Sequence, residues 1–225
     1  MRAVSAIVAA MTIRAVLFDL DGTLADTLDG IAASLNQTLE RFDMPTHDRD
    51  TYRRFVGNGV RKLIERAVPD DRQDQVDAVL EAYLPVLEIR GPAMSRLYPG
   101  VIETLGQLHA RSLPMGVLSN KPDTATVDVV NHLMGDVPFA IVRGQVDNAP
   151  VKPDPTVALQ LVGEMGADPA DVAYVGDSDV DMQLAHRAGF IGVGAAWGLR
   201  GRAELAAHDA DHIIDNPRAL IDLLK

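Results

Sequence analysis

The sequence contains no cysteine among its 225 residues. Disulfide scaffolds, thiolate zinc sites and cysteine nucleophiles are therefore excluded. Positive charge is also scarce, since 21 Lys and Arg residues face 32 Asp and Glu residues for a formal net charge of −11. Such an acidic chain disfavours nucleic acids and anionic membrane surfaces as partners, because both bind basic patches.

Long apolar runs are absent too. No run approaches the roughly 18 residues that indicate a membrane-spanning helix, and a composition of 47% hydrophobic and 24% charged residues is typical of a globular protein. We expect a soluble, cytoplasmic protein. Residues 1–11 have only Arg2 before a short Ala/Val/Ile stretch, too little basic charge for a signal peptide. We expect them to be a disordered extension, with Met11 as a second candidate for the start.

Three short, continuous apolar runs each stop at polar residues. They are Ala15–Phe18, Met115–Leu118 and Val172–Val175. Continuous rather than alternating apolar residues indicate strands buried on both faces, as in a parallel sheet covered by helices. Further strands are expected at Phe139–Val142, Phe190–Val193 and His212–Ile214, and helices at Val101–Ala110 and Thr156–Met165, the latter with Asp154 as its N-cap. The pattern predicts an α/β fold with a doubly wound parallel sheet, whose ligands bind at the carboxyl ends of the strands.

The stretch 27–92 contains no such strand pattern. Its apolar spacing predicts helices at Ile31–Phe42, Arg54–Ala67 and Val76–Ile89. An insert of this length directly after the first strand indicates a separate all-helical cap domain over the sheet. The expected domains are therefore a core of residues 12–26 and 93–225 and a cap of residues 27–92.

Acidic residues follow two of the predicted strands. Asp19 and Asp21 come directly after the first strand, and Asp177 and Asp181 lie four residues apart at the start of a predicted helix, where they would share one face. Capping and the helix dipole could explain one aspartate at a helix start, but not a pair at each of two strand ends. Carboxylates gathered at one sheet edge repel each other unless a cation lies between them, and an all-oxygen set suits Mg²⁺.

A hydroxyl and a cation are predicted at the same edge. Ser119 and Asn120 follow the third apolar run, and Lys152 lies in a later loop. A loop serine or a lone lysine is usually only a solvated residue. Together they would suit a phosphoryl group, which needs hydrogen-bond donors and positive charge around its equatorial oxygens.

Four motifs follow one another along the chain: DLDGT at 19–23, Ser119 at a strand end, Lys152 before a proline, and GDSDVD at 176–181. This set resembles the haloacid dehalogenase-like hydrolase superfamily over nearly the whole chain. The resemblance implies a Rossmann-like core, an inserted helical cap, Mg²⁺ and an aspartyl-phosphate intermediate. By the same resemblance, Asp19 corresponds to the nucleophile and Asp21 to the general acid/base, while Ser119 and Lys152 would bind the phosphoryl group. The metal would be held by Asp19, the Asp21 carbonyl and Asp177, with Asp181 in support, and Thr23 and Asn120 would help to bind substrate.

Within the superfamily, the sequence is most similar to phosphoglycolate phosphatases. Phe55–Gly59 resembles their cap loop, which implies substrate contacts at Gly57 and Asn58. Basic residues also gather around this loop in an otherwise acidic protein, and we expect Arg54 and Arg61 to bind a substrate carboxylate. The expected substrate is a small phosphorylated metabolite, most specifically 2-phosphoglycolate.

Three other functions remain open from the sequence. A phosphosugar mutase would use the same pair of aspartates and return the phosphoryl group to the substrate, and a broad-range sugar or nucleotide phosphatase would share the cap. A non-enzymatic phospho-acceptor module also pairs acidic residues with a hydroxyl and a lysine, but it needs neither Asp21 nor a cap. The sequence leaves open whether the chain is a monomer or a homodimer.

Overall fold

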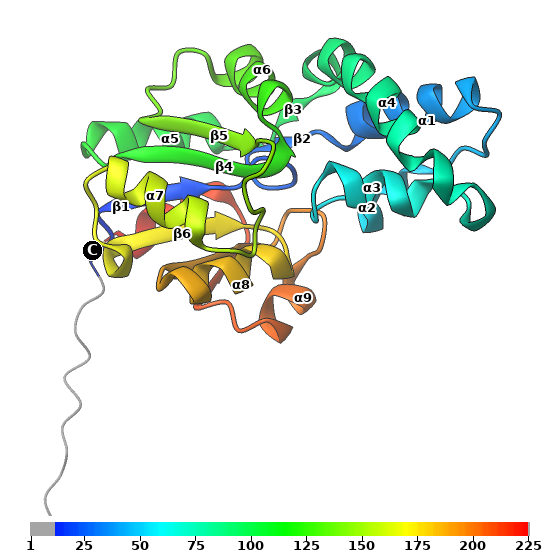
Figure 1. The fold of residues 1–225 in the computed structure, drawn as a ribbon. Coiled ribbons are helices and arrows are strands. Elements are labelled where there is room, and N and C mark those ends of the chain that lie inside the picture. Colours follow the sequence, from blue (N-terminus) through cyan, green and yellow to red (C-terminus); the bar gives the residue numbers. More distant parts are fainter. Residues whose placement is uncertain (1–11, 225) are drawn as a thin grey trace, which may run out of the picture.

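The computed structural model describes residues 12–224, and the predicted extension at residues 1–11 lies outside that range. In the described part, six parallel strands form one sheet in the order β5-β4-β1-β6-β7-β8 (Figure 1). The strands are β1 (Ala15–Phe18), β4 (Met115–Pro122), β5 (Ile141–Gln145), β6 (Val172–Gly176), β7 (Ile191–Ala195) and β8 (His212–Ile214). The predicted strands are all present, although β5 begins two residues later than expected and β4 continues four residues beyond its apolar run.

Both faces of the sheet are buried, as the continuous apolar runs predicted. In β1, Val16 and Phe18 belong to the hydrophobic cluster on one face, whereas Ala15 and Leu17 belong to the cluster on the other. The first cluster includes residues of α5 (Val101–Ala110) and α6 (Asp123–Met134), and the second includes residues of α7 (Thr156–Glu164) and α8 (Asp179–Ala188). The short helix α9 (Arg202–Ala207) packs beside β7 through Leu205. This arrangement confirms the Rossmann-like α/β fold.

The start of α7 differs slightly from the prediction. The helix begins at Thr156, so Pro155 occupies the N-cap position instead of the first helical position. The Asp154 carboxylate nevertheless accepts a hydrogen bond from the Thr156 amide at 2.9 Å. Asp154 therefore still caps a free amide at the start of the helix, although it lies one residue before the N-cap position.

A helical lobe lies beside the carboxyl ends of the strands, toward which the arrowheads of Figure 1 point. It consists of α1 (Leu28–Arg41), α2 (Arg49–Phe55), α3 (Val60–Ala67) and α4 (Val76–Arg90). These helices share a hydrophobic cluster with Leu35, Tyr52, Ile64 and Tyr83 at its centre, and Ala125 of α6 also packs into it. Short 3-10 helices complete the chain at Asp70–Gln75, Pro92–Met94, Pro169–Asp171 and Pro217–Leu223.

The prediction of one helix over Arg54–Ala67 is wrong. The segment is divided between α2 and α3, and the connecting residues Gly57 and Gly59 have φ values of +119° and +90°. Such backbone angles are accessible to glycine and end a helix. The helical periodicity was correct on each side of the break, but the two glycines interrupt it.

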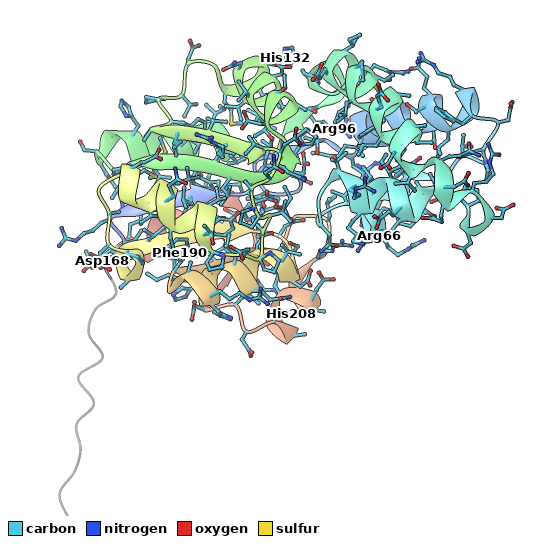
Figure 2. The ribbon with its side chains drawn as sticks, viewed as in Figure 1. Arg66, Arg96, His132, Asp168, Phe190 and His208 are labelled. Atoms are coloured by element: carbon cyan, nitrogen blue, oxygen red, sulfur yellow. The ribbon has the colours of Figure 1, made fainter. Side chains whose placement is uncertain are left out.

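The two lobes are joined by a pair of short antiparallel strands, β2 (Ala25–Asp26) and β3 (Arg96–Leu97). Figure 2 shows Arg96 between the lobes. Its guanidinium pairs with Asp26 at 3.3 Å and with Asp29 at 3.2 Å, and Arg49 of α2 pairs with the same two carboxylates at 3.1 and 2.6 Å. This network ties the helical lobe to its connecting strands. Nowhere in residues 12–224 is there a helix of the length and apolarity needed to cross a bilayer.

Candidate active site

The polar residues predicted at the strand ends meet at one edge of the sheet. β1 pairs with β4 on one side and with β6 on the other, so residues at or just beyond the carboxyl ends of these three strands become neighbours. They line a cavity of about 600 Å³, counting its open mouth, between the sheet edge and the helical lobe. The core contributes Asp19, Asp21, Ser119, Asn120, Lys121, Lys152, Asp177 and Arg200 to its lining, among others.

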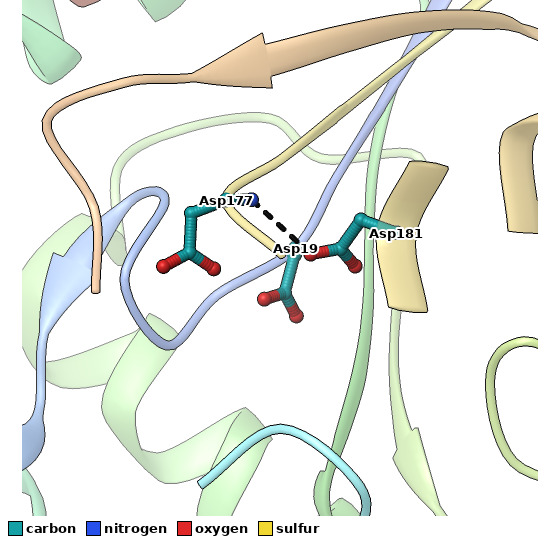
Figure 3. Close-up of side chains that lie close together, drawn as sticks. All are labelled: Asp19, Asp177 and Asp181. Atoms are coloured by element: carbon teal, nitrogen blue, oxygen red, sulfur yellow. Dashed lines mark hydrogen bonds between the residues drawn. The ribbon is translucent and has the colours of Figure 1, made fainter. Parts of the chain in front are cut away.

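Three buried carboxylates converge beside this cavity, and two of them, Asp19 and Asp177, line it (Figure 3). Asp19, Asp177 and Asp181 each offer one carboxylate oxygen, and the three oxygens lie within 4.8 Å of one another. Burial raises the pKa of Asp19 to about 7, against the opposing effect of Lys152 and with a further rise from Asp181. Burial, with Asp181 and Asp19, also raises the pKa of Asp177 well above its ordinary value. Negative charge is therefore unfavourable here until a cation enters.

Asp181 is held differently from the helix-face pair that we expected. The helix α8 begins at Asp179 with Ser178 as its N-cap, so Asp177 lies before the helix and shares no face with Asp181. One Asp181 oxygen accepts hydrogen bonds from the backbone amides of Asp177 and Ser178, both at 3.1 Å, and from the Ser178 hydroxyl at 2.7 Å. The dashed line in Figure 3 marks the first of these bonds. Asp181 thus shapes the loop that carries Asp177.

The Asp177 carboxylate is fixed by close backbone packing. One of its oxygens accepts a hydrogen bond from the Leu199 amide at 2.5 Å. A Cβ at Gly22 or at Gly198 would lie 2.3 Å from the Asp177 side chain, so both positions require glycine. The loop after β7 is held against the loop after β1, since the Trp197 indole donates to the Thr23 carbonyl at 3.0 Å.

Lys152 provides a buried positive charge among the carboxylates. Its ammonium donates to Asp19 at 2.7 Å, to Asp181 at 2.8 Å and to the Tyr174 hydroxyl at 2.9 Å. Burial alone would lower the pKa of Lys152, but Asp181 and Asp19 outweigh burial and raise that pKa well above its ordinary value. Lys152 is therefore charged, and it faces the position where a group attached to Asp19 would lie.

Asn120 orients Lys152 instead of pointing freely into the cavity. Its side-chain oxygen accepts from the Lys152 amide at 2.8 Å, and its NH₂ group donates to the carbonyls of Lys152 and Gly57, each at 3.0 Å. We predicted Asn120 as a substrate ligand, but its amide is already engaged by the backbone. The bond to Gly57 also connects the sheet edge with the helical lobe.

Two further residues of the site were missed in the sequence. The Lys121 ammonium lies 3.2 Å from an Asp21 oxygen, which also accepts from the Thr27 hydroxyl at 2.6 Å. Tyr174, in β6, links Lys152 to the Leu118 carbonyl. Lys121 follows Ser119 and Asn120 directly, so its place beyond the apolar run could have identified it. The Ser119 hydroxyl, buried at the same strand end, accepts from the Lys121 amide at 3.3 Å.

Of the predicted residues in the helical lobe, only Gly57 lines the cavity. Arg54 is exposed and bonds to Thr51, while Arg61 is exposed and pairs with Asp77. Asn58 accepts from Arg66, whose place on the surface of the helical lobe is labelled in Figure 2. The prediction that Arg54, Arg61 and Asn58 contact substrate disagrees with this geometry, because their polar groups bond to other residues of the helical lobe outside the cavity.

Two more residues complete the comparison with the sequence prediction. Thr23 lies on a neighbouring, mostly apolar cavity with Leu24 and Trp197, not on the active-site cavity. The arginine that does line the active-site cavity is Arg200, in the loop after β7. Its guanidinium donates to the carbonyls of Arg53, Arg54 and Val56 in the helical lobe. No motif in the sequence distinguished Arg200 from other surface arginines.

Comparisons with known proteins agree on one family. Residues 16–195 match the haloacid dehalogenase-like hydrolase family. A phosphoglycolate phosphatase of Salmonella paratyphi A is 30% identical over 94% of this chain and 92% of its own length. A phosphoglycolate phosphatase of Escherichia coli K12 is 32% identical over 83% of this chain and 82% of its own length.

Solved structures agree with these sequence matches. The crystal structure of a predicted phosphoglycolate phosphatase from Haemophilus somnus aligns with a TM-score of 0.82 at 27% identity, over 95% of this chain and 98% of that chain. A structure from Lactobacillus delbrueckii aligns with a TM-score of 0.88 at 24% identity, over 95% of this chain and 99% of that one, which supports the fold alone.

Proposed function

Because the chain belongs to the haloacid dehalogenase-like hydrolase family, we propose that it is a Mg²⁺-dependent phosphatase that acts through phosphorylation of Asp19. The family and the named relatives make it a hydrolase of phosphoric monoesters. The metal, the residue roles and the substrate are the parts that we infer. We also infer that residues 27–92 form the cap and that residues 12–26 and 93–225 form the core.

One observation carries the proposal: the Asp19 carboxylate lies in a cavity with a buried ammonium, a buried hydroxyl and two further carboxylates. The ammonium is that of Lys152 and the hydroxyl is that of Ser119. Positive charge and a hydroxyl suit the equatorial oxygens of a phosphoryl group, whereas the carboxylates suit a cation beside it. A solvated acidic loop would need none of this burial.

The residues present fit Mg²⁺. The donors are all oxygens, which are the ligands of hard cations, and repulsion among three buried carboxylates favours a cation between them. Asp19, Asp177 and the Asp21 carbonyl would hold the ion. Asp181 would support this set, because its two oxygens already bond to Lys152 and to the Ser178 loop. The bound ion would supply Lewis-acid polarisation of the phosphoryl oxygens.

The chain's own residues then divide the reaction into two steps. An Asp19 oxygen attacks phosphorus and the bond to the leaving oxygen breaks, while Lys152 and Ser119 bind the phosphoryl oxygens. Asp21 gives its proton to the leaving alkoxide. In the second step Asp21 removes a proton from water, which attacks phosphorus, so that inorganic phosphate leaves and the Asp19 carboxylate returns. Lys121 and Thr27, which contact Asp21, orient it for both proton transfers.

The substrate that we propose is 2-phosphoglycolate. Support comes from the names of the relatives, since phosphoglycolate phosphatases match most of this chain. Three cationic side chains, Lys121, Lys152 and Arg200, line the cavity and could contact the anionic groups of a substrate once a metal ion offsets the carboxylates.

The test is phosphate release from 2-phosphoglycolate by the wild-type protein and by Asp19→Asn. We expect the substitution to abolish turnover, because the amide is a poor nucleophile of nearly the same volume. Chelation should stop the wild-type reaction, and added Mg²⁺ should restore it. Circular dichroism provides the control for folding. More than trace turnover in folded Asp19→Asn, or full activity in excess chelator, would contradict the proposal.

A further inference from the structure

The wall of the active-site cavity formed by the helical lobe is almost entirely apolar. Its side chains are Ile31, Val56, Val60, Leu63 and Leu87, with Tyr83 as the exception. Tyr83 lies on α4, opposite the sheet edge that carries Asp19 and Asp21. A substrate held by its phosphoryl group at Asp19 would therefore direct its other end toward a wall with one polar side chain.

The Tyr83 hydroxyl is buried and has no hydrogen-bond partner among the described residues. The residue itself is 0% exposed. A buried hydroxyl without a partner is costly and is rare in folded proteins. Burial, with a further effect from the Asp21 carboxylate, raises the pKa of Tyr83 well above its ordinary value. The hydroxyl is therefore neutral and keeps its proton available for donation.

The same wall also offers backbone N–H donors at the start of α3. Gly59 is the N-cap of α3, has no side chain to cap the helix, and lines the cavity together with Val60. The first amides of an α-helix have no partner within the helix and favour a negative group. An acceptor group at the free end of a short substrate would meet this helix start and the Tyr83 hydroxyl.

We propose that the Tyr83 hydroxyl donates a hydrogen bond to the carboxylate at the non-phosphorylated end of the substrate and thereby selects carboxylate-bearing phosphomonoesters. This inference rests on the proposed function and goes beyond it, since it identifies the residue that distinguishes substrates. It also replaces Arg54 and Arg61, which do not line the cavity, by a neutral donor on a residue that does.

The experiment compares 2-phosphoglycolate with ethyl phosphate, which keeps the phosphate and the two-carbon chain but lacks the carboxylate. Tyr83→Phe should lower kcat/KM for 2-phosphoglycolate by about 10- to 100-fold, the value of one hydrogen bond to a charged group. For ethyl phosphate it should change kcat/KM less than about twofold. Weaker inhibition by glycolate, the released alcohol, would report the same contact in binding.

The matched control is Tyr52→Phe. Tyr52 is equally buried in the helical lobe, but its hydroxyl donates to Asn36 at 2.5 Å and does not line the cavity. Without ligand, Tyr83→Phe should raise the melting temperature by about 2–4 °C because it removes an unpaired buried hydroxyl, whereas Tyr52→Phe should lower it. Tyr52→Phe should leave the ratio of the two substrates unchanged.

The possible failures are distinct. If the wild-type protein prefers 2-phosphoglycolate and Tyr83→Phe retains the same preference, the inference about Tyr83 is wrong while the proposed function stands. If the wild-type protein hydrolyses both substrates equally, carboxylate selection is wrong and a broad-range phosphatase remains. If it releases phosphate from neither substrate, the proposed function fails as well.

Discussion

Asp19 experiences two opposing influences. Its carboxylate is buried, which favours the neutral form, and it contacts the Lys152 ammonium at 2.7 Å, which favours the charged form. Burial prevails, and the pKa of Asp19 rises to about 7. A nucleophile must be ionised, and a bound cation would lower the pKa of Asp19 and so increase the ionised fraction at neutral pH.

The raised pKa predicts how the stability of the metal-free protein varies with pH. Because the pKa is about 7 when folded and near 3.8 when unfolded, the contribution of Asp19 is fully present below pH 3.8 and is lost as pH rises through 7. Between pH 6 and 8 the wild-type protein should lose about 1 kcal/mol of unfolding free energy relative to Asp19→Asn. Denaturant unfolding of both proteins in chelator measures the difference. Parallel stability curves over this range would contradict the raised pKa.

Residues at strand ends could be predicted from the sequence, and those that depend on lobe packing could not. Asp19, Ser119 and Asp177 each follow an apolar run, and parallel strands bring their carboxyl ends to one edge. Tyr83 lies in the middle of a largely apolar helix, where the sequence pattern indicates that an aromatic residue belongs to the hydrophobic core. Its role depends on how α4 lies across the sheet edge, which no local pattern records.

At the scale of elements, the loop between α2 and α3 decides how closely the helical lobe approaches the sheet. A Cβ at Gly59 would lie 3.0 Å from the Gln145 side-chain oxygen, at the end of β5. The sequence predicted the loop at Phe55–Gly59 through its resemblance to a cap loop, yet helical periodicity alone extended one helix across it. Periodicity reports which residues face the core, but positive φ values at two glycines set the boundary.

Substitution of Gly59 tests this contact. Gly59→Ala introduces strain at φ +90° and crowds Gln145, so we expect a loss of about 1–3 kcal/mol in stability and a lower kcat/KM. The control is Gly201→Ala, since Gly201 is also a helix N-cap with positive φ, at +77°, but a Cβ there meets nothing within 4 Å. Gly201→Ala should lose stability and keep kcat/KM. Equal kcat/KM in the two variants would show that the Gly59 contact does not position the loop.

At the scale of the whole molecule, the two lobes touch at several places, and polar contacts hold two of them. One is the strand pair β2 and β3 with its arginine and aspartate network, and the other is the set of bonds from Asn120 and Arg200 to the α2–α3 loop. The first connection lies where the chain enters and leaves the helical lobe. The second joins the two lobes at the cavity itself, since Val56, Gly57, Asn120 and Arg200 all line it.

Removal of Arg200 should loosen the closed arrangement. The Arg200 guanidinium donates to three backbone carbonyls of the helical lobe, including that of Val56 at 2.7 Å. Arg200→Ala leaves these carbonyls to water, and hydrogen exchange of amides in residues 52–63 should become about five- to tenfold faster, as expected for the loss of about 1 kcal/mol of local stability.

The matched control for Arg200 is Arg202→Ala. Arg202 lies two residues further along, and its guanidinium pairs with the exposed Asp215. This variant removes the same charge from nearly the same place without touching the helical lobe, so exchange in residues 52–63 should stay at the wild-type rate. Exchange of sheet amides in β1 and β6 should change in neither variant, because their bonds lie within the core. If the two variants accelerated exchange equally, general electrostatics would explain the effect, and Arg200 would have no special part in closing the cavity.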